Sequence, residues 1–288
     1  MARSGTKTAV AGRGERRKPK LGQNFLTDHL AARRIVDALG EVSNRTVIEI
    51  GPGHGMLTDL LVKRARKVIG IELDHILAAQ MRMRYATLKN VEILESDFVT
   101  VEWQSMVGRR PGPLHDLRPT QPETVDIVGN LPYYVTSDIV LRILREHQSI
   151  GQAVIMVQRE VADRITAEPG SRDYGLLSGT AQLFARVEKL FTLPPSSFDP
   201  PPQVHSSVVR LTMAPRANEL NVDAEEFEEF LKLGFAQKRK TLANNLKQRY
   251  NDRAISSALK LAGVRADARA EALGLEQMAA IFRALRQA

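Results

Sequence analysis

TVIEIGPGHG, residues 46–55, joins a mostly apolar run to a glycine-rich turn and leads into a helical pattern. An apolar run of this length is typical of a buried parallel strand. Gly51, Gly53 and Gly55 let the backbone turn sharply and approach a ligand with no Cβ in the way. In doubly wound α/β folds the first turn after a strand binds nucleotides. The stretch therefore predicts the first β-α unit of such a fold, with a ligand site at its turn.

The alternation of strands and helices continues to residue 158. Further strand-like runs are 67–73, 91–94, 125–128 and 153–157, and helical patterns cover 55–65, 74–85 and 137–146. Asp74 and Ser137 are the predicted N-caps of the last two helices. Repeated β-α-β units predict a doubly wound sheet. Two later strand-like runs, 186–193 and 206–212, predict an antiparallel edge of that sheet.

From about residue 214 the pattern is helical throughout. Helices are predicted over 221–234, 243–250, 254–261 and 275–285, which indicates a small all-helical C-terminal domain over residues 214–288. Its charge is segregated, because residues 230–251 hold no acid but contain Lys238, Arg239 and Lys240. Such a basic stretch can meet phosphates, and it can equally be a solvated helix face.

Composition excludes several classes of protein. The 288 residues are 43% hydrophobic, enough for a large domain and a small one. There is no cysteine, which excludes disulfides, thiolate catalysis and cysteine zinc sites. No apolar run approaches the roughly 20 residues that cross a bilayer, so we expect no membrane partner and a cytoplasmic location.

The net charge of +8 is concentrated at the N-terminus. Residues 1–20 carry seven basic side chains and one acidic one, so +6 of the +8 lies there. This stretch is predicted to be a disordered basic tail. It is either an arm that binds nucleic acid or a dispensable extension, and the pattern favours neither.

Polar side chains stand at the ends of the next three predicted strands. Glu72 lies roughly 20 residues after the glycine-rich turn, where an acid can hydrogen-bond ribose hydroxyl groups. Asp97 follows the third strand and can accept a hydrogen bond from an adenine amino group, and Asn130 ends the fourth. Carboxyl ends of neighbouring parallel strands form the ligand-binding edge of open α/β sheets. The sequence therefore predicts one site built from all of these turns.

Asn130-Leu131-Pro132-Tyr133 is the most specific of these turns. The Asn130 side chain offers an oxygen to an exocyclic amine, and Pro132 stiffens the turn while leaving the Leu131 carbonyl free to accept. Tyr133 offers a flat face on which a base can stack. The glycine spacing is G-x-G-x-G, without the dinucleotide fingerprint or a Walker-type GK[ST]. This disfavours a nicotinamide-dependent oxidoreductase and an NTPase.

The order of these motifs resembles a class I S-adenosylmethionine-dependent methyltransferase, and more narrowly the rRNA adenine N6-dimethyltransferase family. The motifs are E-I-G-P-G-H-G-x-L-T, I-E-L-D, S-D-F and N-L-P-Y. LGQNFL at 21–26 and FDPPPQVHS at 198–206 are similar to two further motifs of that family. FAQKRKTL at 235–242 resembles the signature of its small-subunit (16S) rRNA branch.

The resemblance implies a role for individual residues. Asn24 and Leu26 would close over S-adenosylmethionine, with Gly51 and Gly53 at its methionine moiety, Glu72 on its ribose and Asp97 on its adenine. Asn130 and the Leu131 carbonyl would bind the target N6, and Tyr133 and Phe198 would sandwich the target base. Lys238, Arg239 and Lys240 would contact RNA. The implied fold is a Rossmann-like methyltransferase domain over 21–213 followed by the helical domain.

The implied function is dimethylation of two adjacent adenines in the 3′-terminal hairpin of small-subunit rRNA, on an assembling 30S subunit, by a monomer without a metal. One alternative is the large-subunit rRNA branch that confers macrolide resistance. Leu131, where that branch usually has Ile, and the signature at 238–242 disfavour it. Another is an assembly or nucleic-acid-binding factor built on this fold. Residues 108–124 are predicted to span a gap and alternatively to touch RNA.

Overall fold

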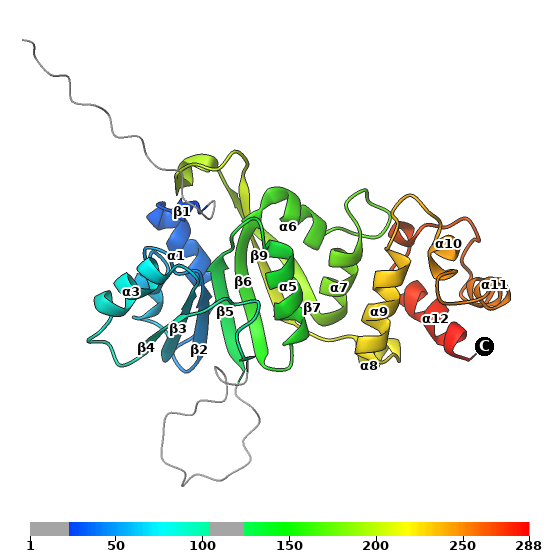
Figure 1. The fold of residues 1–288 in the computed structure, drawn as a ribbon, viewed down its shortest axis with the longest axis horizontal. Helices are drawn as coiled ribbons and strands as arrows, with labels where there is room; N and C mark the ends of the chain where they lie inside the picture. Colours follow the sequence, from blue (N-terminus) through cyan, green and yellow to red (C-terminus); the bar gives the residue numbers. More distant parts are fainter. Residues whose placement is uncertain (1–22, 104–123, 288) are drawn as a thin grey trace, which may run out of the picture.

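The computed structural model describes residues 23–103 and 124–287 (Figure 1). The predicted basic tail, 1–20, and nearly all of the 108–124 loop lie outside these residues. A seven-stranded sheet in the order β4-β3-β2-β5-β6-β9-β7 forms the centre of the described part. Its strands are β2 (Thr46–Ile50), β3 (Lys67–Glu72), β4 (Val91–Glu95), β5 (Val125–Asn130), β6 (Ile150–Gln158), β7 (Ala185–Leu193) and β9 (Ser206–Met213).

The sheet is parallel from β4 to β6 and antiparallel at its other edge. β9 pairs antiparallel with both β6 and β7, while β2, β3, β4, β5 and β6 pair in parallel. This confirms the predicted doubly wound sheet with an antiparallel edge. The parallel strands need helical crossovers, whereas β7 and β9 are joined by residues 194–205, which contain a short 3-10 turn and a two-residue strand, β8 (Phe198–Asp199).

Helices cover both faces of the sheet. They are α1 (His29–Asp37), α2 (Thr58–Leu61), α3 (His75–Arg84), α5 (Thr136–Arg145), α6 (Arg159–Ile165) and α7 (Leu176–Phe184). Ile35 of α1 belongs to the same core cluster as Val47 of β2, whereas Ile143 of α5 belongs to the cluster that contains the next residue of that strand, Ile48. Because successive side chains of a strand point to opposite faces, α1 and α5 lie on opposite sides of the sheet.

Three of these helices were not predicted from the sequence. α7 has almost no polar face, and seven of its nine residues are buried. A helix that is buried all round lacks the amphipathic period by which helices are recognised. α1 is amphipathic and is capped by Asp28, which accepts from the N–H groups of Leu30 and Ala31 at 3.0 Å. α6 is a short helix of seven residues.

The two predicted N-caps had different outcomes. The Asp74 side chain accepts from the N–H groups of Ile76 and Leu77 at 2.9 and 3.2 Å, which confirms that cap. The Ser137 cap is wrong, because α5 begins one residue earlier, at Thr136. The Thr136 hydroxyl donates to the Pro132 carbonyl at 2.9 Å, so the rigid turn after β5 already starts the helix.

The C-terminal part consists of helices that pack at one end of the molecule, beside α7 (Figure 1). They are α8 (Ala217–Leu220), α9 (Ala224–Gly234), α10 (Leu242–Leu246), α11 (Asp252–Leu261) and α12 (Leu275–Arg286). The rings of Phe227, Phe230 and Phe282 have centroids 5.4–6.0 Å apart in their centre. This cluster is continuous with the core beneath α5 and α7. None of the described helices is long and apolar enough to cross a membrane.

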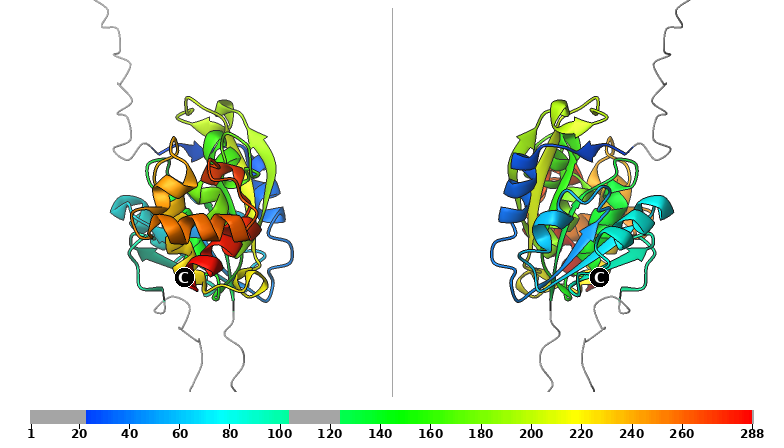
Figure 2. Two further views of the ribbon diagram at one scale, coloured as in Figure 1. Left: turned by 90° about the vertical axis from the view of Figure 1, so that its right-hand side faces the viewer. Right: turned by 90° about the vertical axis from the view of Figure 1, so that its left-hand side faces the viewer.

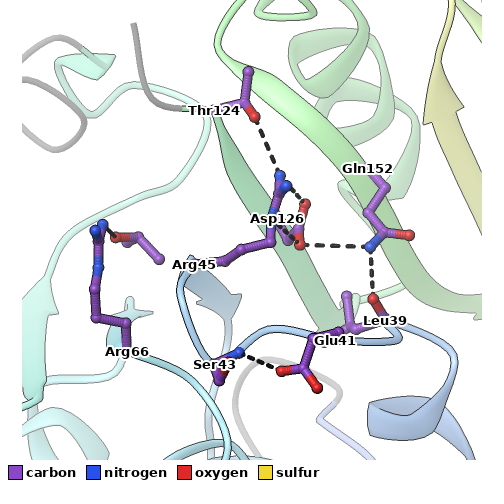
Figure 3. A network of polar contacts seen from close by, with 9 residues as sticks. Leu39, Glu41, Ser43, Arg45, Arg66, Thr124, Asp126 and Gln152 are labelled. Carbon is purple, nitrogen blue, oxygen red and sulfur yellow. Dashed lines mark hydrogen bonds and ion pairs between the residues drawn. The ribbon is translucent and has the colours of Figure 1, made fainter. Parts of the chain in front are cut away.

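A polar network joins the amino ends of β5 and β6 to the segment before β2 (Figure 3). Arg45 forms an ion pair with Asp126 at 2.7 Å and donates to the Thr124 hydroxyl at 3.1 Å. Gln152 donates to Asp126 and to the Leu39 carbonyl, at 3.4 and 2.7 Å. Asp126 is fully buried, and burial raises its pKa despite the guanidinium beside it. The network holds the end of β5 opposite to Asn130.

Candidate active site

A pocket of about 880 Å³, open to solvent, lies at the carboxyl ends of the strands. Its wall contains Gly51 and Gly53 after β2, Glu72 at the end of β3, Asp97 after β4, and Asn130 at the end of β5. These strands are adjacent in space, in the order β4-β3-β2-β5. The polar residues that the sequence places at separate strand ends therefore meet in one pocket.

The glycine-rich turn approaches the pocket with its backbone. Gly51 and Gly53 have φ angles of 63° and 55°, a region that L side chains rarely adopt. The Gly53 N–H donates to Glu72 Oε2 at 3.0 Å. A Cβ at Gly53 would lie 3.0 Å from the ring of Phe25, which also contacts the His54 ring at a centroid distance of 4.2 Å. A side chain at position 53 would therefore crowd Phe25 against the turn.

The last turn of α3 supports the glycine-rich turn from behind. Arg84 donates to the His54 carbonyl at 2.9 Å and forms an ion pair with Asp59. The Tyr85 hydroxyl donates to Asp59 at 2.7 Å, and a Cβ at Gly55 would lie 2.7 Å from that hydroxyl oxygen. The sequence offered no sign of this support, because Arg84 follows His54 by 30 residues.

Glu72 and Asp97 keep acceptor capacity for a ligand. Glu72 is buried, and its two oxygens accept from the N–H groups of Gly53 and Asp74 at 3.0 Å. Each carboxylate oxygen has a second lone pair to offer. Asp97 Oδ1 accepts from the Val99 N–H at 2.8 Å. Within the described residues, no hydrogen bond reaches its Oδ2.

A second buried acid, Glu49, lies on β2 beneath the turn. Its carboxyl is 1% exposed and accepts a hydrogen bond from the Thr58 hydroxyl at 2.6 Å. Burial raises the pKa of Glu49 to about 7, against the Thr58 hydrogen bond, and the nearby Glu72 and Asp59 charges add to the rise. Through this hydrogen bond Glu49 joins β2 to the start of α2. Glu49 is not among the residues that line the pocket.

The Asn130-Tyr133 turn is held on three sides. Asn130 Nδ2 donates to the Asn24 carbonyl at 2.8 Å, and the Leu131 N–H donates to the Met156 carbonyl at 2.9 Å. The Tyr133 hydroxyl and the Ser206 hydroxyl are 3.0 Å apart, and burial raises the pKa of Tyr133. No described residue hydrogen-bonds to Asn130 Oδ1 or to the Leu131 carbonyl. The turn thus presents two acceptors and an aromatic ring.

Leu26 and Phe198 belong to a small second sheet. β1 (Phe25–Leu26) pairs antiparallel with β8 (Phe198–Asp199), so that Leu26 lies opposite Phe198. The blue ribbon of β1 can be seen in both views of Figure 2. Both side chains are buried, at 6% and 4% exposed, in the core that also contains α1. Neither lines the pocket, and the predicted contacts of Leu26 with a cofactor and of Phe198 with a base stay predictions. The pairing does bring the first and the late motif together.

Lys238, Arg239 and Lys240 are exposed on the segment between α9 and α10, outside the pocket wall. Lys238 Nζ donates to the Arg172 carbonyl at 2.5 Å, in the segment between α6 and α7. Other side chains that the sequence did not single out also line the pocket, among them Phe25, Leu73 and Tyr134. Among the described residues, no cluster of acids and histidines could hold a metal ion.

The mostly parallel sheet with this antiparallel edge is the fold of class I methyltransferases, and here the glycine-rich turn and the Asn130 turn line one pocket at its ligand edge. The model of the ribosomal RNA adenine dimethylase family matches residues 14–287, nearly the whole chain. This protein belongs to that family, as its motifs predicted.

Curated relatives match over almost their full length. The ribosomal RNA small subunit methyltransferase A of Koribacter versatilis is 58% identical over 94% of this chain and 95% of its own. The protein of that name from Acidobacterium capsulatum is 53% identical over 96% of this chain and 94% of its own. These identities support the small-subunit branch of the family.

Solved structures agree on the fold. The 23S rRNA methyltransferase ErmE has a TM-score of 0.67 and 29% identity, covering 92% of this chain and all of its own. A dimethyladenosine transferase from Plasmodium falciparum has a TM-score of 0.70 and covers 91% of this chain and 98% of its own. At 23% identity the latter bears on the fold alone.

Proposed function

We propose that this protein transfers methyl groups from S-adenosylmethionine to N6 of two adjacent adenines in the 3′-terminal hairpin of small-subunit rRNA. The observation that carries the proposal is the orientation of Asn130. The Asn24 carbonyl can only accept, so the Asn130 amide turns its nitrogen to it and leaves Oδ1 for an exocyclic amine. The small-subunit target follows from the relatives at 58% and 53% identity.

Two acceptors on one rigid turn suit the amino group of adenine. The N6 lone pair is delocalised into the ring, which makes the nitrogen a poor nucleophile. Asn130 Oδ1 and the Leu131 carbonyl would accept from its two N–H groups and favour a pyramidal nitrogen with an available lone pair. After one transfer a single N–H remains, so a second transfer needs only one of these acceptors. Positioning and electrostatics carry such a reaction without a strong base.

The residues of the pocket fit the cofactor. Glu72 has a buried carboxylate with lone pairs to spare for ribose hydroxyl groups, and Asp97 Oδ2 is open to an adenine amino group. The backbone at Gly51 and Gly53 would face the methionine moiety, beneath Asn24 and Leu26. When bound, S-adenosylmethionine supplies an electrophilic methyl group on a sulfonium. The protein's part is to hold that group opposite the Asn130 turn.

Tyr133 would stack on the target base after it leaves the RNA stack. Removing a base from its stack costs a few kcal/mol, and aromatic stacking offsets about 1–3 kcal/mol per base. The Ser206 hydroxyl holds the Tyr133 ring in place. Phe198 would form the other side of the sandwich, and this requires its ring to leave the core in which it packs beside Leu26.

The helical part would contact RNA away from the pocket. We propose that residues 214–288 form a domain that binds RNA phosphates through Lys238, Arg239 and Lys240, and that residues 21–213 bind the cofactor. The protein would act as a monomer on the assembling 30S subunit, in the cytoplasm. The likeness to a 23S rRNA methyltransferase favours large-subunit RNA as the alternative substrate.

Mass-spectrometric mapping of methylated adenosine tests the proposal. Purified protein and S-adenosylmethionine are incubated with unmethylated small subunits and, separately, with large-subunit RNA. Dimethyladenosine at both adenines of the 3′-terminal hairpin is the expected product. Label on large-subunit RNA alone would move the protein to the other branch. The absence of label from both, with cofactor bound, would indicate an assembly factor built on this fold.

A further inference from the structure

Tyr134 is the one aromatic side chain among the large hydrophobic residues that are exposed in the described part of the chain. It is 61% exposed, and it lines the mouth of the pocket next to Tyr133. No described residue hydrogen-bonds to its hydroxyl group. Large apolar side chains on a surface need no explanation when they are isolated, but this ring stands at the entrance of the active site.

The backbone around Tyr134 is rigid. The Pro132 carbonyl accepts from the Val135 N–H at 3.3 Å and from the Thr136 hydroxyl at 2.9 Å, so the turn closes around residues 133 and 134. Tyr133 is turned inward, where its hydroxyl meets Ser206. The neighbouring Tyr134 side chain is exposed to solvent. Two consecutive aromatic rings thus serve one pocket, the first in its wall and the second at its rim.

We infer that Tyr134 is a stacking platform for the nucleobase next to the target adenine, an inference that rests on the proposed function. When the target base leaves its stack, the neighbouring base loses a stacking partner. An aromatic side chain at the rim replaces that partner, as aromatic residues do for unstacked RNA bases. Since the two proposed target adenines are adjacent, one of them would lie on Tyr134 while the other is in the pocket.

Leu73 shows why the assignment falls on Tyr134. Leu73 is the other exposed large hydrophobic residue of the pocket wall, at 49% exposed. It directly follows Glu72, the last residue of β3. That position is on the side where the cofactor would bind. Tyr134 follows β5 and the Asn130 turn, the side of the target amine. An exposed ring on that side meets the RNA chain first.

Binding measurements on two hairpins isolate the contact. One hairpin carries both adenines of the 3′-terminal loop, and the other has an abasic site in place of one of them. Wild type should bind the intact hairpin about 5- to 150-fold more tightly than the abasic one. Tyr134→Ala should bind both alike, whereas Tyr134→Phe and Tyr134→Trp should keep the wild-type preference. Met83→Ala, at a side chain 80% exposed outside the pocket wall, is the control.

Methylation of unmethylated small subunits completes the test. Tyr134→Ala should raise KM for the subunit while the affinity for S-adenosylmethionine and Tm stay unchanged. Equal binding of the two hairpins by wild type, or a Tyr134→Phe variant as weak as Tyr134→Ala, would overturn the inference. So would a loss of cofactor affinity. Failure of the proposed function is distinguishable, because wild type would then leave the small subunit unmethylated.

Discussion

Asn130 Nδ2 lies 2.8 Å from the carbonyl oxygen of Asn24, a residue 106 positions earlier in the chain. The contact decides which end of the Asn130 amide faces the pocket, because a carbonyl accepts and never donates. It also ties the segment before β1 to the end of β5. The side chain that we propose to bind the target amine therefore also holds Asn24 in the pocket wall.

Asn130→Ala should abolish methyl transfer, because the amine loses the side-chain acceptor. Cofactor affinity, measured by calorimetry, should stay within about tenfold, roughly 1.4 kcal/mol. Asn130→Asp should also fail, since a carboxylate cannot donate to the Asn24 carbonyl. Asn218→Ala, at an exposed asparagine on α8, is the control. A collapse of cofactor binding in parallel with activity would contradict the role given to Asn130.

Gly53→Ala should weaken cofactor binding by displacing Phe25. Its Cβ would lie 3.0 Å from the Phe25 ring, at a φ of 55°. Gly40→Ala is a matched control, because Gly40 has a φ of 69° and open space around the added methyl group. Both replacements should lower stability by about 1–2 kcal/mol through the left-handed backbone. Equal cofactor affinity of the two variants would argue against a steric role of Gly53.

Glu49→Gln should change how stability depends on pH. The pKa of Glu49 is about 7 in the folded protein, above its ordinary 4.5, so the unfolded chain releases this proton first as pH rises. The stabilising contribution of protonated Glu49 to the free energy of unfolding is fully present below pH 4.5. It is lost as pH rises through about 7, and the loss amounts to up to about 3 kcal/mol. Gln accepts the Thr58 hydrogen bond without titrating, so the variant should gain stability relative to wild type from pH 5 to 8.

Urea denaturation at pH 5 and pH 8 measures this difference. Glu41→Gln is a control of opposite sign, because the Ser43 N–H lowers the pKa of the exposed Glu41. The contribution of Glu41 is present at neutral pH and is lost on acidification, so its replacement should give no relative gain at high pH. Parallel pH profiles of Glu49→Gln and wild type would show that Glu49 is ionised throughout.

Replacing Lys238, Arg239 and Lys240 together with Ala should weaken RNA binding most at low salt. Each phosphate contact contributes about −0.7 to −0.9 to the slope of log K against log salt, so the slope should become shallower by about 2–3. The control replaces three exposed cations of the N-terminal half, Arg33, Lys63 and Lys89. Titrations at several salt concentrations measure both, and an unchanged slope would assign the three residues to a solvated face.

Much of the pocket lining could be predicted because its signals are local. Gly51 and Gly53 are required by a turn of a few residues. Glu72 and Asn130 end strands that their own apolar runs reveal, and Asp97 comes shortly after another such strand. Parallel strands bring their carboxyl ends to one edge, so the convergence of these side chains follows from the strand pattern. The pocket wall contains all five residues.

Other features depend on segments that are remote in sequence. The pairing of Leu26 with Phe198, the donation from Arg84 to the His54 carbonyl and the orientation of Asn130 each join residues with no shared local pattern. α7 could not be recognised, because burial on all sides removes its amphipathic period.

The sequence by itself determined the doubly wound sheet, the turns that line the pocket and the family, since short-range spacing and residue type carry all three. Only the tertiary structure decided that Tyr133 is turned inward while Tyr134 is exposed at the pocket mouth. The two side chains are chemically identical and adjacent. Their difference comes from Ser206 on β9, which is 73 residues from Tyr133 and reaches it only after the sheet has formed.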